Sequence, residues 1–541
     1  MHKNKKHFSF AVALLTSAWA AHAAPIPATS DGHLGLYPAN DFRITDGTCS
    51  DCTTIPQALW YFNGETLAAP AKNNAGFSPV KQAQADVASW ASGKPDLATQ
   101  PPLVWLGSST VIPHAMLSTD GKTMALDDGT SLGFGIVPKI STNLSYWNDS
   151  TSQYFAQRPL RLRGEANGNT FTARTVWPLD YSIAPASPSA PLIKGESLKS
   201  LVQYENGGAR SPYQARLLWE RSLGAAQKSP GKAVVGLMLN GAQGDDDEAH
   251  GGHFGVITGR FEADGNWSRW LVNNFYNLDS FSEKGIVAAI TPMDKYLMDL
   301  NNGQSYYRPS YMLVATFKSD APAALYQGAI NRVYNHFYRH DFVYDHSRDN
   351  CSGISIDTFR TLGWNVPERG VESHLKATAA YIYVGATEGS LDKGRKIYDY
   401  LTTETTRLYP AVTFDAMGND LLALAQGNTG RDLTPFEQKL AQNIEAIWFV
   451  RIPQAPSSRA FGLAPVYSFD QYMSQAPEDR SQWKIVPTEP RPFPENLRDG
   501  LALAQEKPAT IPLPIAGLGL GMCLTLVGIR RRKAKRKKSA D

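Results

Sequence analysis

The stretch HFGVITG at residues 253–259, with DNCSG at residues 349–353 further along, decides how this chain is organised. The first stretch is apolar enough for a buried strand and opens with His253. The second places Cys351 at the start of a predicted helix. A cysteine and a histidine are the minimum set for a thiol nucleophile and its base. The alternatives are a buried structural thiol at Cys351 and a hydrogen-bonded histidine at the strand edge.

The hydrophobic pattern around these stretches predicts strands first and helices afterwards. Apolar runs indicate four strands, over 233–239, 253–260, 270–274 and 311–317. The sequence DGN at 264–266 is typical of a hairpin turn between the second and third strands. Behind Asp320 the apolar residues recur every four positions, which predicts a helix over 325–337. A second helix begins at Cys351 and ends at Gly363, a glycine suited to a C-terminal cap.

This arrangement suits nucleophilic chemistry. A helix N-terminus and a nearby histidine both lower the pKa of a thiol, and the Cys351 N–H can serve as half of an oxyanion hole. A polar residue on the next strand would orient the His253 ring. Asn273 and Asn274 both occupy that strand, and only one can face the same side as His253. Three further residues are candidates for contact with substrate or oxyanion: Asn350, Ser352 and Tyr344.

The order histidine, polar residue, cysteine resembles that of circularly permuted papain-like proteins, which include the lecithin:retinol acyltransferase-like branch of the NlpC-type enzymes. The matching motifs here are HFGVITG at 253–259 and NCS at 350–352. The resemblance implies a thiol hydrolase or acyltransferase that acts on amide, ester or thioester bonds, with Cys351 as nucleophile and His253 as base. Between the polar strand and the cysteine helix, residues 279–309 form an insertion, either a substrate lid or a loop.

An acidic stretch offers a competing site. Residues 245–253 read DDDEAHGGH, which combines four carboxylates with His250 and His253. Carboxylates suit hard cations and histidines suit zinc. Because no helix fixes the two histidines, a solvated acidic loop is the favoured interpretation. We therefore predict neither a metal nor another cofactor.

The ends of the chain have the composition of targeting segments. Residues 1–23 combine lysines, a short apolar core and the small-residue site AHA, as secretory signals do. Residues 513–529 are apolar, and residues 530–538 carry eight basic side chains, which predicts a membrane anchor with a cytoplasmic tail. This end resembles the PEP-CTERM sorting tails of bacteria, which implies a sorting peptidase as partner. Its proline motif reads IPLP rather than Pro-Glu-Pro, and a plain anchor is the alternative.

Charge and cysteine content limit the function classes. The chain has 53 basic and 50 acidic residues, but 42 and 49 remain once the three N-terminal lysines, the basic tail and Asp541 are set aside. The exported body is therefore acidic, which gives no support for nucleic-acid binding. Cys49 and Cys52 are predicted to form a disulfide in an oxidising compartment. Cys351 is left without a partner.

Together these features predict an α+β protein with a signal peptide at 1–23, a β-rich domain at 24–190, a permuted papain-like domain at 192–370 and a helical region at 371–500. A linker, a transmembrane helix and the basic tail follow at 501–541. We expect an exported protein of the periplasm or cell surface, anchored by its C-terminal helix, that hydrolyses an amide in a peptide or other envelope substrate. The alternatives are a non-catalytic surface-binding protein and a metal-dependent hydrolase centred on the acidic loop.

Overall fold

The computed structural model of the chain describes residues 34–37, 41–45, 65–70, 80–93, 95, 97, 101, 103–140, 145–204, 209–242, 251–277, 288–458 and 461–475. The predicted signal peptide, the Cys49–Cys52 pair, most of the acidic loop and the C-terminal tail lie outside these ranges. Within them, none of the helices has the length and apolar character needed to span a membrane.

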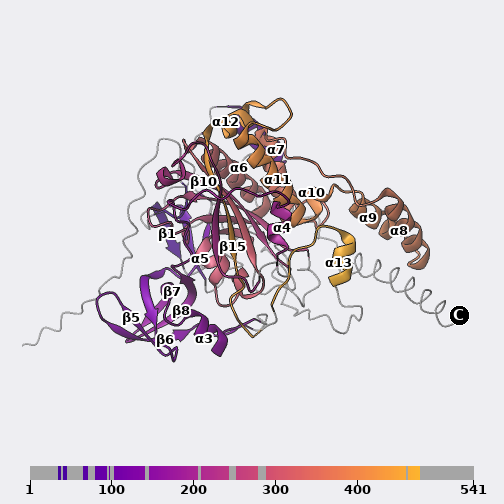
Figure 1. Ribbon diagram of the computed structural model, residues 1–541. Coiled ribbons are helices and arrows are strands. Elements are labelled where there is room, and N and C mark those ends of the chain that lie inside the picture. Colours follow the sequence, from indigo (N-terminus) through magenta and orange to yellow (C-terminus); the bar gives the residue numbers. More distant parts are fainter. Residues whose placement is uncertain are drawn as a thin grey trace, which may run out of the picture.

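A ten-stranded sheet runs through the centre of the molecule (Figure 1). Its order is β1-β2-β3-β13-β12-β11-β10-β14-β15-β9. The strands are β1 (Phe42–Thr45), β2 (Thr66–Pro70), β3 (Val104–Gly107), β9 (Gln214–Glu220), β10 (Ala233–Asn240), β11 (His253–Arg260), β12 (Leu271–Asn274), β13 (Ala289–Pro292), β14 (Ser310–Phe317) and β15 (Ile444–Ile452). All neighbours pair antiparallel except β13 and β3, which are parallel.

The central strands are apolar along their whole length because the sheet is covered on both faces. Every residue of β10, β11 and β14 is buried. In β10, Leu237 and Leu239 belong to the core shared with the helices, whereas Val234 and Met238 belong to a second core on the opposite face. A strand buried on both faces reads as a continuous apolar run, which is why the sequence pattern of these strands was so clear.

Helices cover the first face and a small barrel covers part of the second (Figure 1). The helices that carry the argument are α6 (Ala321–Tyr338), α7 (Cys351–Leu362), α10 (Thr405–Leu408) and α11 (Pro410–Gln426). The barrel is closed, in the order β4-β5-β6-β8-β7. Its strands are β4 (Thr110–Leu117), β5 (Thr123–Leu126), β6 (Ser131–Ile136), β7 (Pro159–Asn167) and β8 (Thr170–Pro178), and α3 (Asp149–Phe155) connects β6 to β7. This is the strand order of an OB-type barrel, a fold that by itself assigns no function.

The α+β class is confirmed, and so are the elements predicted around the two motifs. The four strands correspond to β10, β11, β12 and β14, and the helix behind Asp320 is α6. The turn at 264–266 is present, with the Asn266 N–H donating to Asp264 Oδ1 at 2.9 Å. Helix α7 spans Cys351–Leu362 and is capped by Gly363 at φ 103°.

Two predictions about local structure need correction. The capping pattern at residues 434–437 predicts a helix whose apolar face continues through Ile444 and Ile447, but α12 (Pro435–Asn443) stops at Asn443 and both isoleucines lie in β15. The run IEAIWFVRI is rich in β-branched and aromatic residues, and it pairs with β14 and β9 inside the sheet. The segment predicted as an inserted lid or loop at 279–309 contains regular structure. Its described part supplies β13 and α5 (Met293–Met298), which is buried between barrel and sheet.

Two further helices form a hairpin that projects from the body (Figure 1). Helix α8 (His374–Thr387) and helix α9 (Leu391–Leu401) pack against each other with their own small core. We call this hairpin the arm. The chain leaves the arm into α10 and later returns to it through α13 (Phe469–Gln475), whose Phe469 and Tyr472 join the core of the arm.

Candidate active site

Asn350 fixes the start of the helix that carries the cysteine. Its side-chain Oδ1 accepts hydrogen bonds from the N–H groups of Ser352 and Gly353, at 3.0 and 2.8 Å. Its Nδ2 donates to the carbonyl oxygens of His346 and Arg407, at 2.9 Å each. All of these bonds are internal to the protein, so Asn350 is an N-terminal cap. The predicted role in contacting substrate is therefore not what its geometry offers.

The thiol of Cys351 lies at the start of β11, against the backbone of the residue that follows His253. Cys351 is 5% exposed. Its sulfur is within hydrogen-bond reach of the backbone N–H of Phe254, the residue after His253, and of the Tyr344 hydroxyl. Helix α7 therefore brings the cysteine to the strand that carries the histidine, although the two lie far apart along the chain.

Asn274, and not Asn273, contacts His253. The His253 Nε2 and Asn274 Oδ1 lie 2.5 Å apart. The register pairs Val256 with Asn273, so Asn274 shares a face with His253 while Asn273 points to the opposite face. Asn273 donates from Nδ2 to the Val256 carbonyl and accepts from Gln327 Nε2, at 3.1 and 3.2 Å. The register of the hairpin thus distinguishes the two asparagines.

The contact with Asn274 determines which nitrogen of the ring is available as a base. Because an amide oxygen can only accept, the Nε2 of His253 carries the hydrogen that is donated to Asn274. Nδ1 of the neutral ring then carries the lone pair. The pKa of His253 is lowered to about 3, chiefly by burial and also by the positive charge of Arg308, while the bond to Asn274 partly opposes both effects. His253 is therefore neutral near pH 7.

The cysteine is neutral in the same range. Burial raises the pKa of the Cys351 thiol above its usual value, and the N–H of Phe254 and the hydroxyl of Tyr344 only partly oppose this. The expectation that the helix N-terminus and the histidine lower this pKa is thus not met. Desolvation outweighs the helix dipole because the sulfur is sealed from water. The resting pair is a thiol and an imidazole rather than a thiolate and an imidazolium.

Tyr344 occupies the position predicted for an oxyanion. The N–H of Cys351 donates to the Tyr344 hydroxyl at 3.3 Å. The Tyr344 ring stacks on Tyr276 at 5.7 Å, and the Tyr276 ring lies 6.1 Å from that of His253. An incoming carbonyl oxygen that takes the Cys351 N–H must displace the Tyr344 hydroxyl. The Tyr344 hydroxyl thus holds the N–H that the predicted oxyanion would need.

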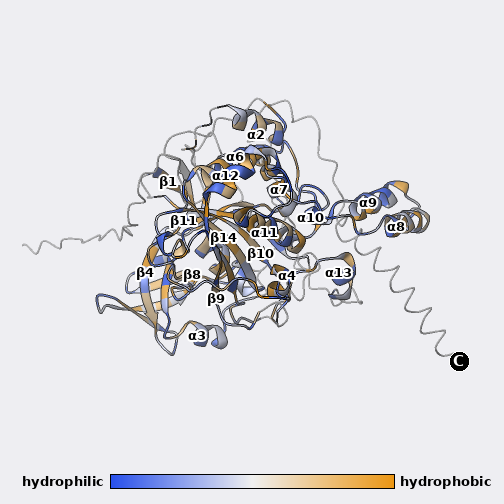
Figure 2. Cartoon of the chain, turned by 45° about the horizontal axis from the view of Figure 1, so that its top comes forward, coloured by the Kyte–Doolittle hydropathy of each residue, from blue (hydrophilic) through white to orange (hydrophobic). Residues whose placement is uncertain are grey.

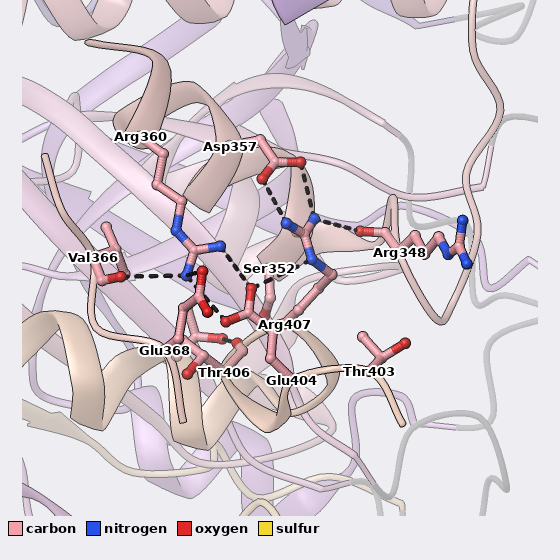
Figure 3. Close-up of polar contacts among 12 residues, drawn as sticks. Arg348, Ser352, Asp357, Arg360, Val366, Glu368, Thr403, Glu404, Thr406 and Arg407 are labelled. Carbon is pink, nitrogen blue, oxygen red and sulfur yellow. Dashed lines mark hydrogen bonds and ion pairs between the residues drawn. The ribbon is translucent and has the colours of Figure 1, made fainter. Parts of the chain in front are cut away.

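A network of arginines and carboxylates holds the turn before Cys351 in place (Figure 3). The guanidinium of Arg407, on α10, donates to the Arg348 carbonyl at 3.0 Å and to both carboxylate oxygens of Asp357 on α7, at 2.9 and 2.6 Å. Beside it, Arg360 pairs with Glu404 at 2.6 Å. Figure 3 shows these pairs linking α7 to the segment that ends in α10. Arg407 therefore clamps the turn before Cys351 to α7.

The same clamp explains why residue 353 is a glycine. A Cβ atom on Gly353 would lie 2.0 Å from the Arg348 carbonyl oxygen and 2.9 Å from an Arg407 nitrogen. The neighbouring Ser352 is fully buried and gives its N–H to Asn350. Ser352 thus supports the turn, and its hydroxyl lies within hydrogen-bond reach of the Cys351 sulfur.

The sequence missed the second set of polar residues around the site. Asn240 pairs with His253 across β10 and β11, and its Oδ1 accepts a hydrogen bond from the Tyr296 hydroxyl at 2.5 Å. Cys351 is close enough to Tyr296 to raise the pKa of that phenol, although burial is the larger cause. A polar residue that ends an otherwise apolar strand, as Asn240 does, was the available signal. Arg308 comes from the insertion and carried no such signal.

The remaining candidates lie partly or wholly outside the described residues. His250 and the carboxylates at 245–248 belong to the undescribed part of the acidic loop, as the Cys49–Cys52 pair belongs to another gap. Among the side chains that the structure places, no group of histidines, cysteines and carboxylates is arranged to hold a metal ion. Comparison of this chain with models of protein families, with curated proteins and with solved structures gave no match.

Proposed function

We propose that this protein is an exported cysteine hydrolase in which Cys351 is the nucleophile, His253 the general base and Asn274 the residue that orients the imidazole. One observation carries the proposal. The Cys351 sulfur lies at the N–H of Phe254, while the preceding His253 gives its Nε2 to Asn274. The chain order histidine, asparagine, cysteine is also that of the permuted papain-like proteins that the two motifs resemble.

The neutral pair determines the proposed order of events. As the sulfur bonds to the carbonyl carbon, the thiol proton moves to Nδ1 of His253, so no thiolate forms in advance. The carbonyl oxygen, now negative, takes the Cys351 N–H in place of Tyr344. Collapse of this intermediate expels the amine, which receives the proton from His253. Water, deprotonated by the same nitrogen, then cleaves the acyl-thioester and frees the acid and the thiol.

The predicted ends of the chain suggest the substrate class. An exported protein held at the membrane by residues 513–529 meets peptides and the stem peptides of the cell wall. We therefore propose an amide in the cell envelope as substrate, with the bilayer and a sorting peptidase as partners of the tail. No cofactor is needed for this chemistry.

A burst assay tests the proposal. Full-length protein in detergent is mixed with a p-nitrophenyl ester, and nitrophenolate release is followed against time. We expect a burst close to one equivalent per chain, because acylation precedes slower hydrolysis. Cys351→Ser should abolish the burst, and His253→Ala should slow it by about 10²–10⁴-fold, the usual contribution of a general base. A burst of equal size in Cys351→Ser would show that the ester reacts elsewhere and would refute the proposal.

A further inference from the structure

Tyr344 contacts both groups of Cys351 that the proposed reaction uses. Its hydroxyl accepts a hydrogen bond from the Cys351 N–H at 3.3 Å and lies within hydrogen-bond reach of the sulfur. The Tyr344 ring stacks on Tyr276, whose own ring lies 6.1 Å from that of His253. One side chain therefore covers the nucleophile and also holds the donor that the predicted oxyanion would need.

The thiol is closed to a substrate in this arrangement. Cys351 is 5% exposed. Attack on a carbonyl carbon requires the two reacting atoms to approach within about 3–3.5 Å of each other. A neighbour of the sulfur must therefore move before the proposed reaction can begin.

Of the residues that contact the sulfur, Tyr344 is the one outside regular structure. The Phe254 N–H belongs to β11, which pairs with β10 inside the sheet, and Ser352 lies in the first turn of α7. Tyr344 belongs instead to residues 339–350, which join α6 to α7 without forming a helix or a strand. Figure 2 shows the two helices next to each other. We call residues 339–350 the α6–α7 connection.

The α6–α7 connection is held near both ends and exposed in the middle. Asp341 bonds to a histidine of α6 at 2.6 Å, and the Arg348 carbonyl oxygen accepts a bond from Arg407 at 3.0 Å. Between these points Val343 is 64% exposed and Tyr344 is half-buried. The Tyr344 side chain can thus rotate outward while α6, α7 and both attachment points stay in place.

We propose that Tyr344 is an autoinhibitory gate over Cys351, which opens when a substrate carbonyl oxygen takes the Cys351 N–H. This inference rests on the proposed hydrolase and adds the regulation of its site. In the closed form the tyrosine engages the thiol and the oxyanion donor together, so the protein does not attack amides at random. One rotation of the side chain frees both groups, because both are held by the same hydroxyl.

Two reactions of the same sulfur test the gate in full-length protein. Alkylation by iodoacetamide needs an accessible sulfur, whereas the burst from a p-nitrophenyl ester also needs the free N–H. Tyr344→Ala removes both ring and hydroxyl, and we expect both rates to rise. If the open form normally makes up about 0.1–10% of the molecules, as minor conformers commonly do, the rise is about 10–1,000-fold.

Tyr344→Phe separates the hydroxyl from the ring. The N–H becomes free, so the burst should be about 2–10-fold faster, which is the net contribution of one hydrogen bond. Alkylation should not rise, because the ring still covers the sulfur and the lost hydroxyl no longer lowers the pKa of the thiol. Val343→Ala is the matched control. It alters an exposed side chain of the same connection and should leave both rates nearly unchanged.

The outcomes distinguish a failed gate from a failed hydrolase. Unchanged alkylation in Tyr344→Ala would overturn the gate, because another group would then close the site. A slower burst in Tyr344→Phe would also overturn it, since the hydroxyl would then assist the reaction. Faster alkylation of Tyr344→Ala with no burst in any form of the protein would support a gate over the thiol and refute the hydrolase instead.

Discussion

Two buried polar regions of this molecule differ in the charge state of their side chains. At the contact between barrel and sheet, charged side chains stay charged because each has an opposite partner. At the start of β11, His253 and Cys351 meet amide and hydroxyl groups instead, and both are neutral. The comparison teaches that burial alone does not set a charge state. The charge of the partner decides it.

The charged region is centred on α5. Asp294 accepts from Arg161 and Arg163, both at 2.9 Å, and all three are almost fully buried. One turn later, Asp299 pairs with Lys295 at 2.5 Å and with Arg174 at 2.8 Å. Burial by itself would raise the pKa of Asp299, but the two cations outweigh it and hold the pKa at about 2. This network joins the barrel to the sheet.

The largest effect is expected where a charge loses its partner. Asp294→Ala leaves two buried guanidinium groups uncompensated, and we expect the free energy of unfolding to fall by about 3–5 kcal/mol. Asp180→Ala is the control, because Asp180 pairs with Arg158 at a half-exposed position. It should cost about 0–1 kcal/mol. Urea unfolding of both variants measures the difference, and equal losses would show that burial does not govern these pairs.

The neutral region should reveal itself through pH. The pKa of His253 is about 3 in the folded protein, against an ordinary value of 6.5 for a histidine side chain. Between pH 3 and 6.5, His253 is protonated in the unfolded chain but not in the folded chain. The free energy of unfolding therefore falls as the pH falls from 6.5 towards 3. The slope is about 1.4 kcal/mol per pH unit. His253→Gln should remove this part of the slope in unfolding experiments from pH 7 to 4. If the unaltered protein and His253→Gln lost stability in parallel as the pH falls, His253 would have an ordinary pKa in the folded protein.

A smaller effect separates the two asparagines. Asn274→Ala removes the acceptor that holds the His253 ring. We expect the nitrophenolate burst to slow by about 10–100-fold, because residues that orient a catalytic or metal-binding histidine contribute about this much. Asn273→Ala breaks bonds to Val256 and Gln327 on the other face. It should lower stability while the burst rate stays within a few-fold of the original. The reverse result would assign the orienting role to Asn273.

The sequence predicted the elements around the site better than the site itself. Strands β10, β11 and β14 were predictable because both of their faces are buried, and α7 was predictable from the glycine that ends it, Gly363. The choice between Asn273 and Asn274 depended on the register of β11 and β12, which pairs Val256 with Asn273. Local pattern does not encode register over so short a strand.

The charge state of the pair was beyond the sequence for a different reason. A helix N-terminus and a histidine do lower a thiol pKa, but only the packed structure reveals that Cys351 is 5% exposed and that burial outweighs both. The entry of β15 into the sheet was missed likewise, because its pairing partners β14 and β9 lie far away along the chain. The charge state of Cys351 and the pairing of β15 both depend on contacts between residues that are far apart in the sequence.

The pH profile of Cys351 alkylation by iodoacetamide tests the neutral cysteine–histidine pair most directly. Peptide mass spectrometry follows the modification of Cys351 in the full-length protein, beside His253→Ala. We expect a rate that keeps rising through pH 9 with no plateau below pH 7, and a large loss of rate in the variant. A plateau between pH 4 and 7 would reveal a preformed thiolate–imidazolium pair, and a rate that ignores His253 would show that the two residues do not act together.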